Sequence, residues 1–238
     1  MKFVDVQKEL KKYSSEKRKK SNEWYFKTGF GDYGYGDKFI GLSMPQIRNV
    51  SKKFNLLPLQ EIKRLLSSKI HEERMTALII LSYQFEKADK KIQKKIYNFY
   101  LKNTKYINNW DLVDVTVNRI VGAYLWKNKD ENRKILYKLA LSKNMWERRI
   151  AIIATSYFIY QNYFTDTLKI SKILLNDKED LLHKAVGWML REVGKRNQKE
   201  EEKFLKKYYK KMPRTMLRYA VEKFPETKRK AYLKGNVL

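Results

Sequence analysis

The chain has 238 residues, with 53 Lys and Arg against 26 Asp and Glu, and a formal net charge of +27. It contains no cysteine, which excludes disulfides, thiol nucleophiles and iron–sulfur clusters. Such a positive charge makes nucleic acid the expected partner, with an anionic membrane surface as the alternative partner. The charge could also reflect lysine enrichment by an AT-rich genome. No apolar run reaches the roughly 18 residues of a membrane span, and the charged N-terminus lacks the apolar stretch of a signal peptide. We therefore expect a cytoplasmic protein.

Apolar residues recur at spacings of three and four along the chain, which predicts helices and no strand. The predicted helices cover residues 2–19, 21–28, 44–54, 58–67, 71–86, 90–104, 109–126, 130–141, 144–161, 165–175, 178–196, 198–210 and 213–224. Ser43 followed by Pro45, and Pro213, are typical of helix starts. We predict N-terminal helices and a glycine-rich loop over 1–57, five helical hairpins over 58–225, and a basic, frayed tail over 226–238.

The glycine-rich segment 29–37, GFGDYGYGD, formally contains the motif G-x-G-x-x-G. A dinucleotide site needs that motif between a strand and a helix, whereas here a helical pattern precedes it and no parallel-sheet unit follows. We expect a surface turn, or an aromatic loop that contacts a ligand or caps the helices. His71 and His183 have no second His or Cys at ligand spacing, so no metal site is expected. Each histidine is expected at a helix end or on the surface.

Five segments of the chain align with one another and share one position, occupied by Ala77, Asp114, Ala151, Gly187 and Ala220. The steps of 37, 37, 36 and 33 residues match a helical-hairpin array, in which each hairpin hides its apolar side by stacking on its neighbours. A small residue here lets the next helix approach closely, whereas a carboxylate needs a basic group or a ligand opposite it. We therefore predict an all-α, right-handed helical-repeat solenoid, a single curved domain with a basic concave face, and Asp114 as its anomaly.

Side chains on the second helices of successive hairpins are predicted to line one face together with Asp114. Trp110 lies one helical turn before it, Arg148 and Arg149 belong to the next hairpin, and Trp188 belongs to the hairpin after that. A carboxylate flanked by aromatic rings is suited to stabilising positive charge, such as that of an oxocarbenium-like sugar. Each residue taken alone also fits a place in the core or an ordinary salt bridge, and the sequence leaves open which arginine faces the groove.

Four segments resemble the AlkD-type DNA alkylation-repair glycosylases, which are built from HEAT-like helical repeats. They are NNWDLVD at 108–114, WERRIAI at 146–152, KAVGWMLREVGK at 184–195 and WYFKTGFGDYGYGDKFIG at 24–41. The resemblance covers nearly the whole chain. It implies excision of cationic 3-methyladenine and 7-methylguanine from double-stranded DNA, without metal or cofactor.

The resemblance also implies roles for individual residues. Asp114 matches the carboxylate that stabilises the developing sugar cation and positions water. Trp110 and Trp188 match the tryptophans that lie against the lesion-bearing nucleotide and its backbone. Arg149 matches the arginine beside that cleft, and Tyr25 matches an aromatic residue of the N-terminal helices.

The loop at 29–37 is longer than the corresponding turn in the best-characterised members, and this departure is not expected to involve the candidate catalytic cluster. The expected function is that of a monofunctional glycosylase, a monomer that acts on alkylated duplex DNA and has no membrane partner. One alternative is a non-catalytic helical-repeat protein that binds damaged or branched nucleic acid, with Asp114 a structural partner of Arg149. Another is a protein-binding scaffold whose charge reflects genome composition.

Overall fold

A computed structural model describes residues 1–128 and 133–237 of the chain. Over these residues the fold is helical, and its extended pairing is an isolated bridge between Lys38 and Ile70. This confirms the all-α prediction. No helix in the described ranges is both long and apolar enough to cross a membrane. Backbone packing divides the chain into two compact units, Met1–Ile120 and Val121–Leu238.

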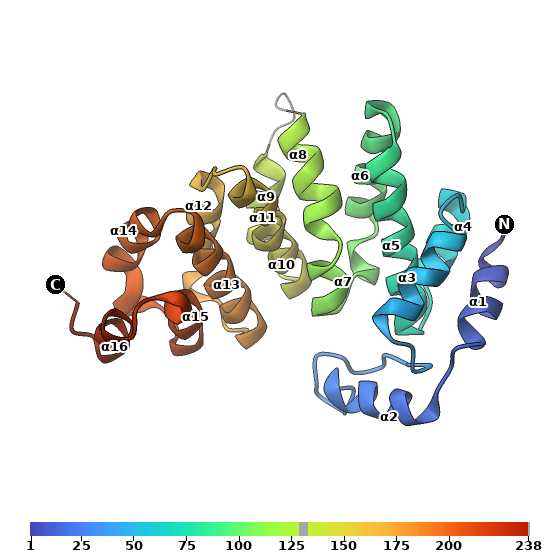
Figure 1. The fold of residues 1–238 in the computed structure, drawn as a ribbon, viewed down its shortest axis with the longest axis horizontal. Coiled ribbons are helices and arrows are strands. Elements are labelled where there is room, and N and C mark those ends of the chain that lie inside the picture. Colours follow the sequence, from blue (N-terminus) through green and yellow to red (C-terminus); the bar gives the residue numbers. More distant parts are fainter. Residues whose placement is uncertain (129–132, 238) are drawn as a thin grey trace. The chain divides into compact units, whose positions relative to one another are not determined.

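The first unit is organised around one buried helix (Figure 1). Its helices are α1 (Phe3–Lys11), α2 (Glu16–Tyr25), α3 (Met44–Lys53), α4 (Leu59–Leu66), α5 (His71–Lys87), α6 (Lys90–Lys102) and α7 (Trp110–Asp114). Helix α5 contacts α3, α4, α6 and α7, and is buried along most of its length. Its buried Glu72 carboxylate is satisfied by hydrogen bonds from the backbone N–H groups of Ile40, Gly41 and Leu42. The segment that follows α2 is thereby held against the start of α5.

The N-terminal prediction of one helix over 2–19 is wrong, because the chain turns between α1 and α2. Ser14 closes the end of α1 by donating from its hydroxyl to the carbonyl of Lys11. Ser15 begins α2 as its N-cap, accepting from the Arg18 N–H, and its own N–H donates to the carbonyl of Ile40 at 3.0 Å. Serine side chains compete with the helix for backbone groups and so favour such boundaries.

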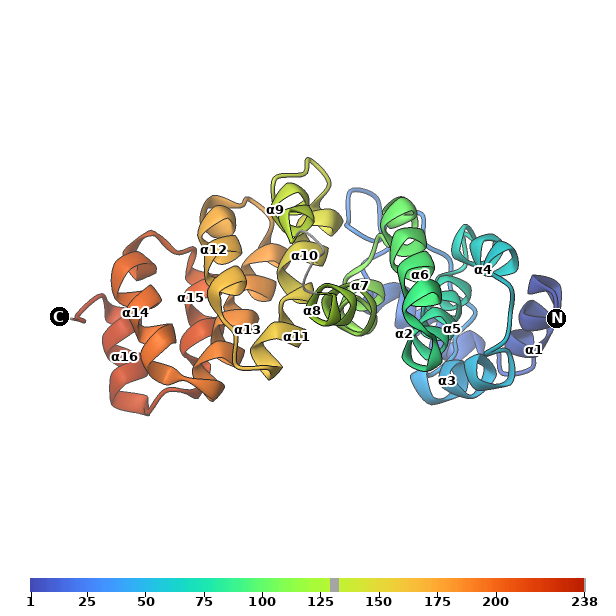
Figure 2. The same cartoon turned by 90° about the horizontal axis from the view of Figure 1, so that it is seen from above.

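The second unit stacks helical pairs side by side (Figure 2). Its helices are α8 (Ala123–Lys127), α9 (Lys134–Ala140), α10 (Met145–Ala154), α11 (Ser156–Tyr160), α12 (Thr165–Ile173), α13 (Asp180–Arg196), α14 (Gln198–Tyr208), α15 (Arg214–Ala220) and α16 (Glu226–Lys234). Helix α13 contacts α10, α12, α14 and α15, so it occupies the centre of this unit. The predicted helix starts at Ser43, which forms a capping box, and at Pro213 are confirmed.

Two of the predicted second helices are interrupted. The helix predicted over 109–126 consists of α7, a π-helical turn at Asn118–Gly122, and α8. The helix predicted over 144–161 is broken between α10 and α11. A threonine hydroxyl donates to a preceding carbonyl at each break: Thr116 to Leu112 at 2.6 Å and Thr155 to Ile152 at 2.7 Å. Such bonds weaken or bend a helix locally, which apolar periodicity does not reveal.

The C-terminal segment is helical, which corrects the expectation of a frayed tail. Helix α16 follows Pro225 and ends at Gly235, which adopts a left-handed conformation with φ of 81°. Tyr232 is 2% exposed, and the Tyr209 hydroxyl donates to the carbonyl of Gly235 at 3.0 Å. The tail therefore belongs to the core of the second unit up to that glycine.

The same turn recurs before α5 and before α10, which supports the repeat register. Ser68 and Ser142 each accept, at the hydroxyl, the N–H of the residue two positions later, at 3.0 and 3.1 Å. Six residues after each serine, an arginine donates back to the serine carbonyl: Arg74 to Ser68 and Arg148 to Ser142, both at 3.0 Å. Residues at equivalent positions of the two hairpins thus make the same hydrogen bonds.

Gly187 confirms that a small residue allows close helix approach at the repeat position. A Cβ atom there would lie 2.4 Å from the carbonyl oxygen of Met216 and 2.5 Å from Cβ of Tyr219, both on α15. We expect Gly187→Ala to lower the free energy of unfolding by about 1 to 3 kcal/mol, because the backbone must shift. Denaturant unfolding measures the change. Gly29→Ala, which would meet only a flexible carboxylate, is the control. Stabilisation by Gly187→Ala, as helix propensity alone would give, contradicts the close packing.

Candidate active site

Asp114 differs from the other residues at the repeat position in its surroundings as well as its identity. The aligned Ala77, Ala151 and Ala220 are at most 1% exposed, whereas Asp114 is half-buried. It is the last residue of α7, and Trp110 is the first, so both lie on one face of this short helix. A carboxylate at a helix C-terminus opposes the helix dipole. The interaction of Asp114 with the dipole of α7 is therefore unfavourable.

Tyr100 from α6 lies close enough to sense the charge of Asp114. It is fully buried, and its hydroxyl is 3.2 Å from that of Thr116. Burial raises the pKa of Tyr100, the hydrogen bond with Thr116 lowers it, and the negative charge of Asp114 raises it further. Tyr100 therefore stays a neutral phenol and adds no second negative charge near Asp114.

Trp110 is fixed by a stack of aromatic rings from the N-terminal segment. Phe26, which follows α2, stacks on Trp110 with ring centroids 5.4 Å apart and an interplanar angle of 21°. Tyr25 meets the same indole edge-on at 6.0 Å. Phe26 also stacks on Phe39, with ring centroids 5.2 Å apart, and its centroid lies 4.9 Å from that of the His71 ring. The structure therefore brings together Tyr25 and Trp110, two of the predicted site residues, while 57% of Tyr25 stays exposed.

Three polar side chains anchor the start of α7. Asn109 caps the helix, accepting the Trp110 N–H at 2.8 Å. Asp111 accepts the Leu112 N–H through one carboxylate oxygen and Nε2 of His71 through the other, both at 2.8 Å. His71 is 3% exposed and also contacts Asp37 through Nδ1, at 3.2 Å. An imidazole that donates to two carboxylates has to carry a proton on each nitrogen.

The pKa values of this cluster agree with a charged imidazole. Burial lowers the pKa of His71, and so does the charge of Arg74. The charge and hydrogen bond of Asp111 and the hydrogen bond of Asp37 outweigh both and raise the pKa to about 9. Burial acts to raise the pKa of Asp37, yet the hydrogen bond from His71 and the charge of Arg74 hold it below its ordinary value. The helix start is thus held by a buried imidazolium between two anions.

Arg148 and Arg149 lie in the second unit and have different partners. Arg148 forms a two-pronged ion pair with Asp177, at 2.6 and 3.1 Å, as expected of a salt-bridge arginine. Arg149 is 5% exposed, and its guanidinium donates to the backbone carbonyl of Leu181 at 2.5 Å. Because Leu181 lies in the first turn of α13, Arg149 ties α10 to the helix that carries Trp188.

Trp188 is half-buried on α13, and its indole N–H donates to the Glu192 carboxylate one turn later at 3.2 Å. It belongs to the second unit with both arginines, whereas Tyr25, Trp110 and Asp114 belong to the first. Each unit therefore supplies one part of the predicted cluster. The convergence of the two parts on a single groove stays a prediction.

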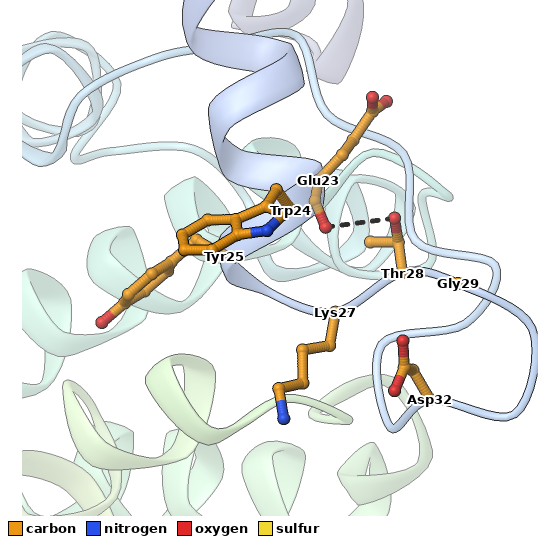
Figure 3. A pocket seen from close by; sticks show the side chains of 7 residues that line it. All are labelled: Glu23, Trp24, Tyr25, Lys27, Thr28, Gly29 and Asp32. Atoms are coloured by element: carbon orange, nitrogen blue, oxygen red, sulfur yellow. Dashed lines mark hydrogen bonds between the residues drawn. The ribbon is translucent and has the colours of Figure 1, made fainter.

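An open pocket of about 660 Å³ borders on Tyr25 (Figure 3). It is lined by Glu23, Trp24, Tyr25, Lys27, Thr28, Gly29 and Asp32. The Thr28 hydroxyl donates to the backbone carbonyl of Glu23, which holds the chain in a turn here. Trp24 is 81% exposed and Lys27 is exposed as well, so this part of the surface offers an indole and an ammonium group to a partner.

Sequence reasoning missed the cluster around His71. The residue begins α5, in agreement with a helix end, but it is buried and not on the surface. The glycine-rich loop contributes to this cluster, since Asp37 contacts His71 and Asn109, neither of which is among the predicted site residues. The one signal in the sequence was the charged run HEER, which begins at His71 and leads directly into an apolar helical segment. In the described part of the chain, no group of His, Asp and Glu side chains could hold a metal ion.

Comparison with known proteins relates the chain to one protein family and to two solved structures. The sequence model described as "DNA alkylation repair enzyme" matches residues 6–224. A solved structure described as a predicted DNA alkylation repair enzyme from Enterococcus faecalis is 18% identical, with a TM-score of 0.72 over 90% of this chain and 97% of that one. AlkD2 from Streptococcus mutans is 19% identical, with a TM-score of 0.53 over 94% of this chain and 98% of that one. No curated protein matches the chain.

At such identities the two structures establish the fold alone, and they confirm the predicted AlkD-like helical repeats. The family match extends from α1 to the 3-10 turn after α15, and so includes each of the predicted site residues. The chain therefore belongs to the DNA alkylation repair enzyme family.

Proposed function

We propose that this protein is a monofunctional DNA glycosylase that hydrolyses the N-glycosidic bond of cationic alkylated purines, such as 3-methyladenine and 7-methylguanine, in duplex DNA. Membership of a DNA alkylation repair family supports the substrate class. A purine alkylated on a ring nitrogen is already positively charged and leaves as a neutral base. The site therefore needs no acid to protonate the leaving group.

Asp114 is the residue proposed to carry the chemistry. As the bond between C1′ and the purine nitrogen breaks, positive charge develops on the sugar, and a carboxylate opposite it lowers the energy of that state. The same carboxylate can accept a proton from the water that forms the new bond to C1′. Trp110 and Trp188 are proposed to lie against the nucleotide, and Tyr25 and Arg149 beside it.

The observation that carries this proposal is the half-buried position of Asp114. Every alanine at the repeat position is sealed in the core, whereas this carboxylate keeps access to solvent one turn away from an indole held by Phe26 and Tyr25. The dipole of α7 and an apolar core both disfavour an anion at this position. A site for a developing cation gives a carboxylate there a chemical role.

The direct test is release of free base. Methylated duplex DNA is incubated with the protein, and 7-methylguanine and 3-methyladenine are separated and counted. We expect free base without strand cleavage, because no lysine is proposed as a nucleophile. Binding without release would instead support the alternative of a non-catalytic protein that recognises damaged or branched nucleic acid.

Affinity for duplex DNA is expected to fall steeply with salt. A net charge of +27 implies many phosphate contacts, each of which releases a counterion on binding. We expect the dissociation constant for an undamaged duplex to rise on the order of a hundredfold or more between about 50 and about 200 mM salt. Fluorescence anisotropy measures this. An affinity independent of salt would favour the protein-binding scaffold.

A further inference from the structure

The segment 26–37, which contains the loop at 29–37, is joined to the candidate catalytic helix near both of its ends. Phe26, three residues before the loop, stacks on Trp110. At its end, Asp37 is 6% exposed in its side chain and receives hydrogen bonds from His71, Arg74 and Asn109, at 3.2, 2.7 and 3.3 Å. Asn109 is also the cap of α7. The loop is therefore part of the framework that places Trp110 and Asp114.

His71 adds a further connection between the loop and α7. Its two ring nitrogens contact Asp37 in the loop and Asp111 in α7, while its ring stacks on Phe39 with centroids 4.7 Å apart. The charged groups that face it are those two carboxylates and the guanidinium of Arg74. The neighbouring Glu72 carboxylate is turned to backbone N–H groups after the loop. One buried imidazole thus connects the loop, α5 and α7.

Helix α7 depends on such connections because it is only five residues long. A helix of that length has few bonds of its own and is not stable by itself. Its first turn takes its direction from the Asn109 cap and from Asp111, which is bonded to His71. A small rotation of this turn would move Asp114 and Trp110 together.

We infer that His71 is a positioning residue, whose bond to Asp111 sets the orientation of α7 and with it the Asp114 carboxylate and the Trp110 indole. This inference rests on the proposed function. The bond between His71 and Asp37 is the less critical one, since Asp37 keeps Arg74 and Asn109 as partners when His71 is changed.

Two variants separate the two bonds of His71. The amide nitrogen of glutamine occupies the place of Nε2, so His71→Gln keeps the bond to Asp111. The amide nitrogen of asparagine occupies the place of Nδ1, so His71→Asn keeps the bond to Asp37. We expect single-turnover base release by His71→Gln to stay within a few-fold of wild type, and release by His71→Asn to fall on the order of a hundredfold. The dissociation constant for undamaged duplex should be the same for both.

A purely structural role would give a different pattern. Both variants would then slow base release in proportion to their loss of thermal stability, and that result would overturn the inference. Ile62→Val, in the core of the same unit on α4, is the control for lost stability and should release base at the wild-type rate.

If His71→Asn does not fold, the variants Asp111→Asn and Asp111→Ala test the same bond from its other side, because only asparagine can still accept the imidazole N–H. Release should survive in the first and fall in the second.

A second readout keeps the inference distinct from the proposed function. The indole N–H resonance of Trp110, identified by its loss in Trp110→Phe, reports the position of α7 without any reaction. We expect it to shift in His71→Asn and to stay in place in His71→Gln. A wild-type protein that releases no base would refute the proposed function alone. Equal shifts in both variants would refute the positioning role alone.

Discussion

Asp114→Asn is expected to abolish base release while leaving affinity for undamaged duplex DNA near that of wild type. The amide has the size of the carboxylate but cannot offer a full negative charge to the developing sugar cation. Loss of one electrostatic group of this kind costs about 100-fold to 1000-fold in rate, on the order of 3 to 4 kcal/mol in the transition state. Single-turnover release of 7-methylguanine measures the rate, and anisotropy on undamaged duplex measures binding.

Asp89→Asn is the matched control for this experiment. It makes the same chemical change in the same unit, and Asn caps a helix as well as Asp does, so α6 keeps its N-cap bond to Ile92. Both variants add one unit of positive charge, so any general effect on DNA affinity should be shared. Release at the wild-type rate by Asp114→Asn would remove this carboxylate from the mechanism. The family assignment and the fold would stand.

Much of the fold follows from local pattern. The three- and four-residue spacing of apolar residues gives the positions of α5 and α13 within one or two residues at each end. The repeat register is local information as well, and it brings out Asp114 because a single residue departs from four small ones. Gly187 then shows in the structure why the others are small. A periodic signal of this kind needs no knowledge of distant contacts.

The parts of the site that escaped prediction depend on contacts between residues far apart in the sequence. His71 meets Asp37 across 34 residues and Asp111 across 40. Neither carboxylate carries a local mark that sets it apart from the other acidic residues of the chain. The broken helix after Asp114 has a local cause instead, since the Thr116 hydroxyl donates to the carbonyl of Leu112 within an otherwise apolar, helix-like segment.

The stability contributed by His71 is expected to disappear as the pH rises from about 6.5 to about 9. Burial lowers the pKa of this imidazole, but Asp111 and Asp37 raise it to about 9 in the folded protein, against about 6.5 in the unfolded chain. The folded state therefore holds a proton that the unfolded state has lost, and protonation stabilises the fold. The contribution is complete below pH 6.5 or so, and on the order of 3 kcal/mol is lost across the window.

The difference in free energy of unfolding between wild type and His71→Gln isolates this contribution, because glutamine does not titrate and the other groups are common to both proteins. We expect the advantage of wild type to shrink with pH, by up to about 1.4 kcal/mol per unit inside the window. The imidazole resonances give an independent measurement, since the chain has only two histidines and His71→Gln assigns them. A difference that stays constant from about pH 6.5 to about pH 9, with a His71 resonance that titrates at its ordinary value, would show that the imidazole is not held as a cation between Asp37 and Asp111.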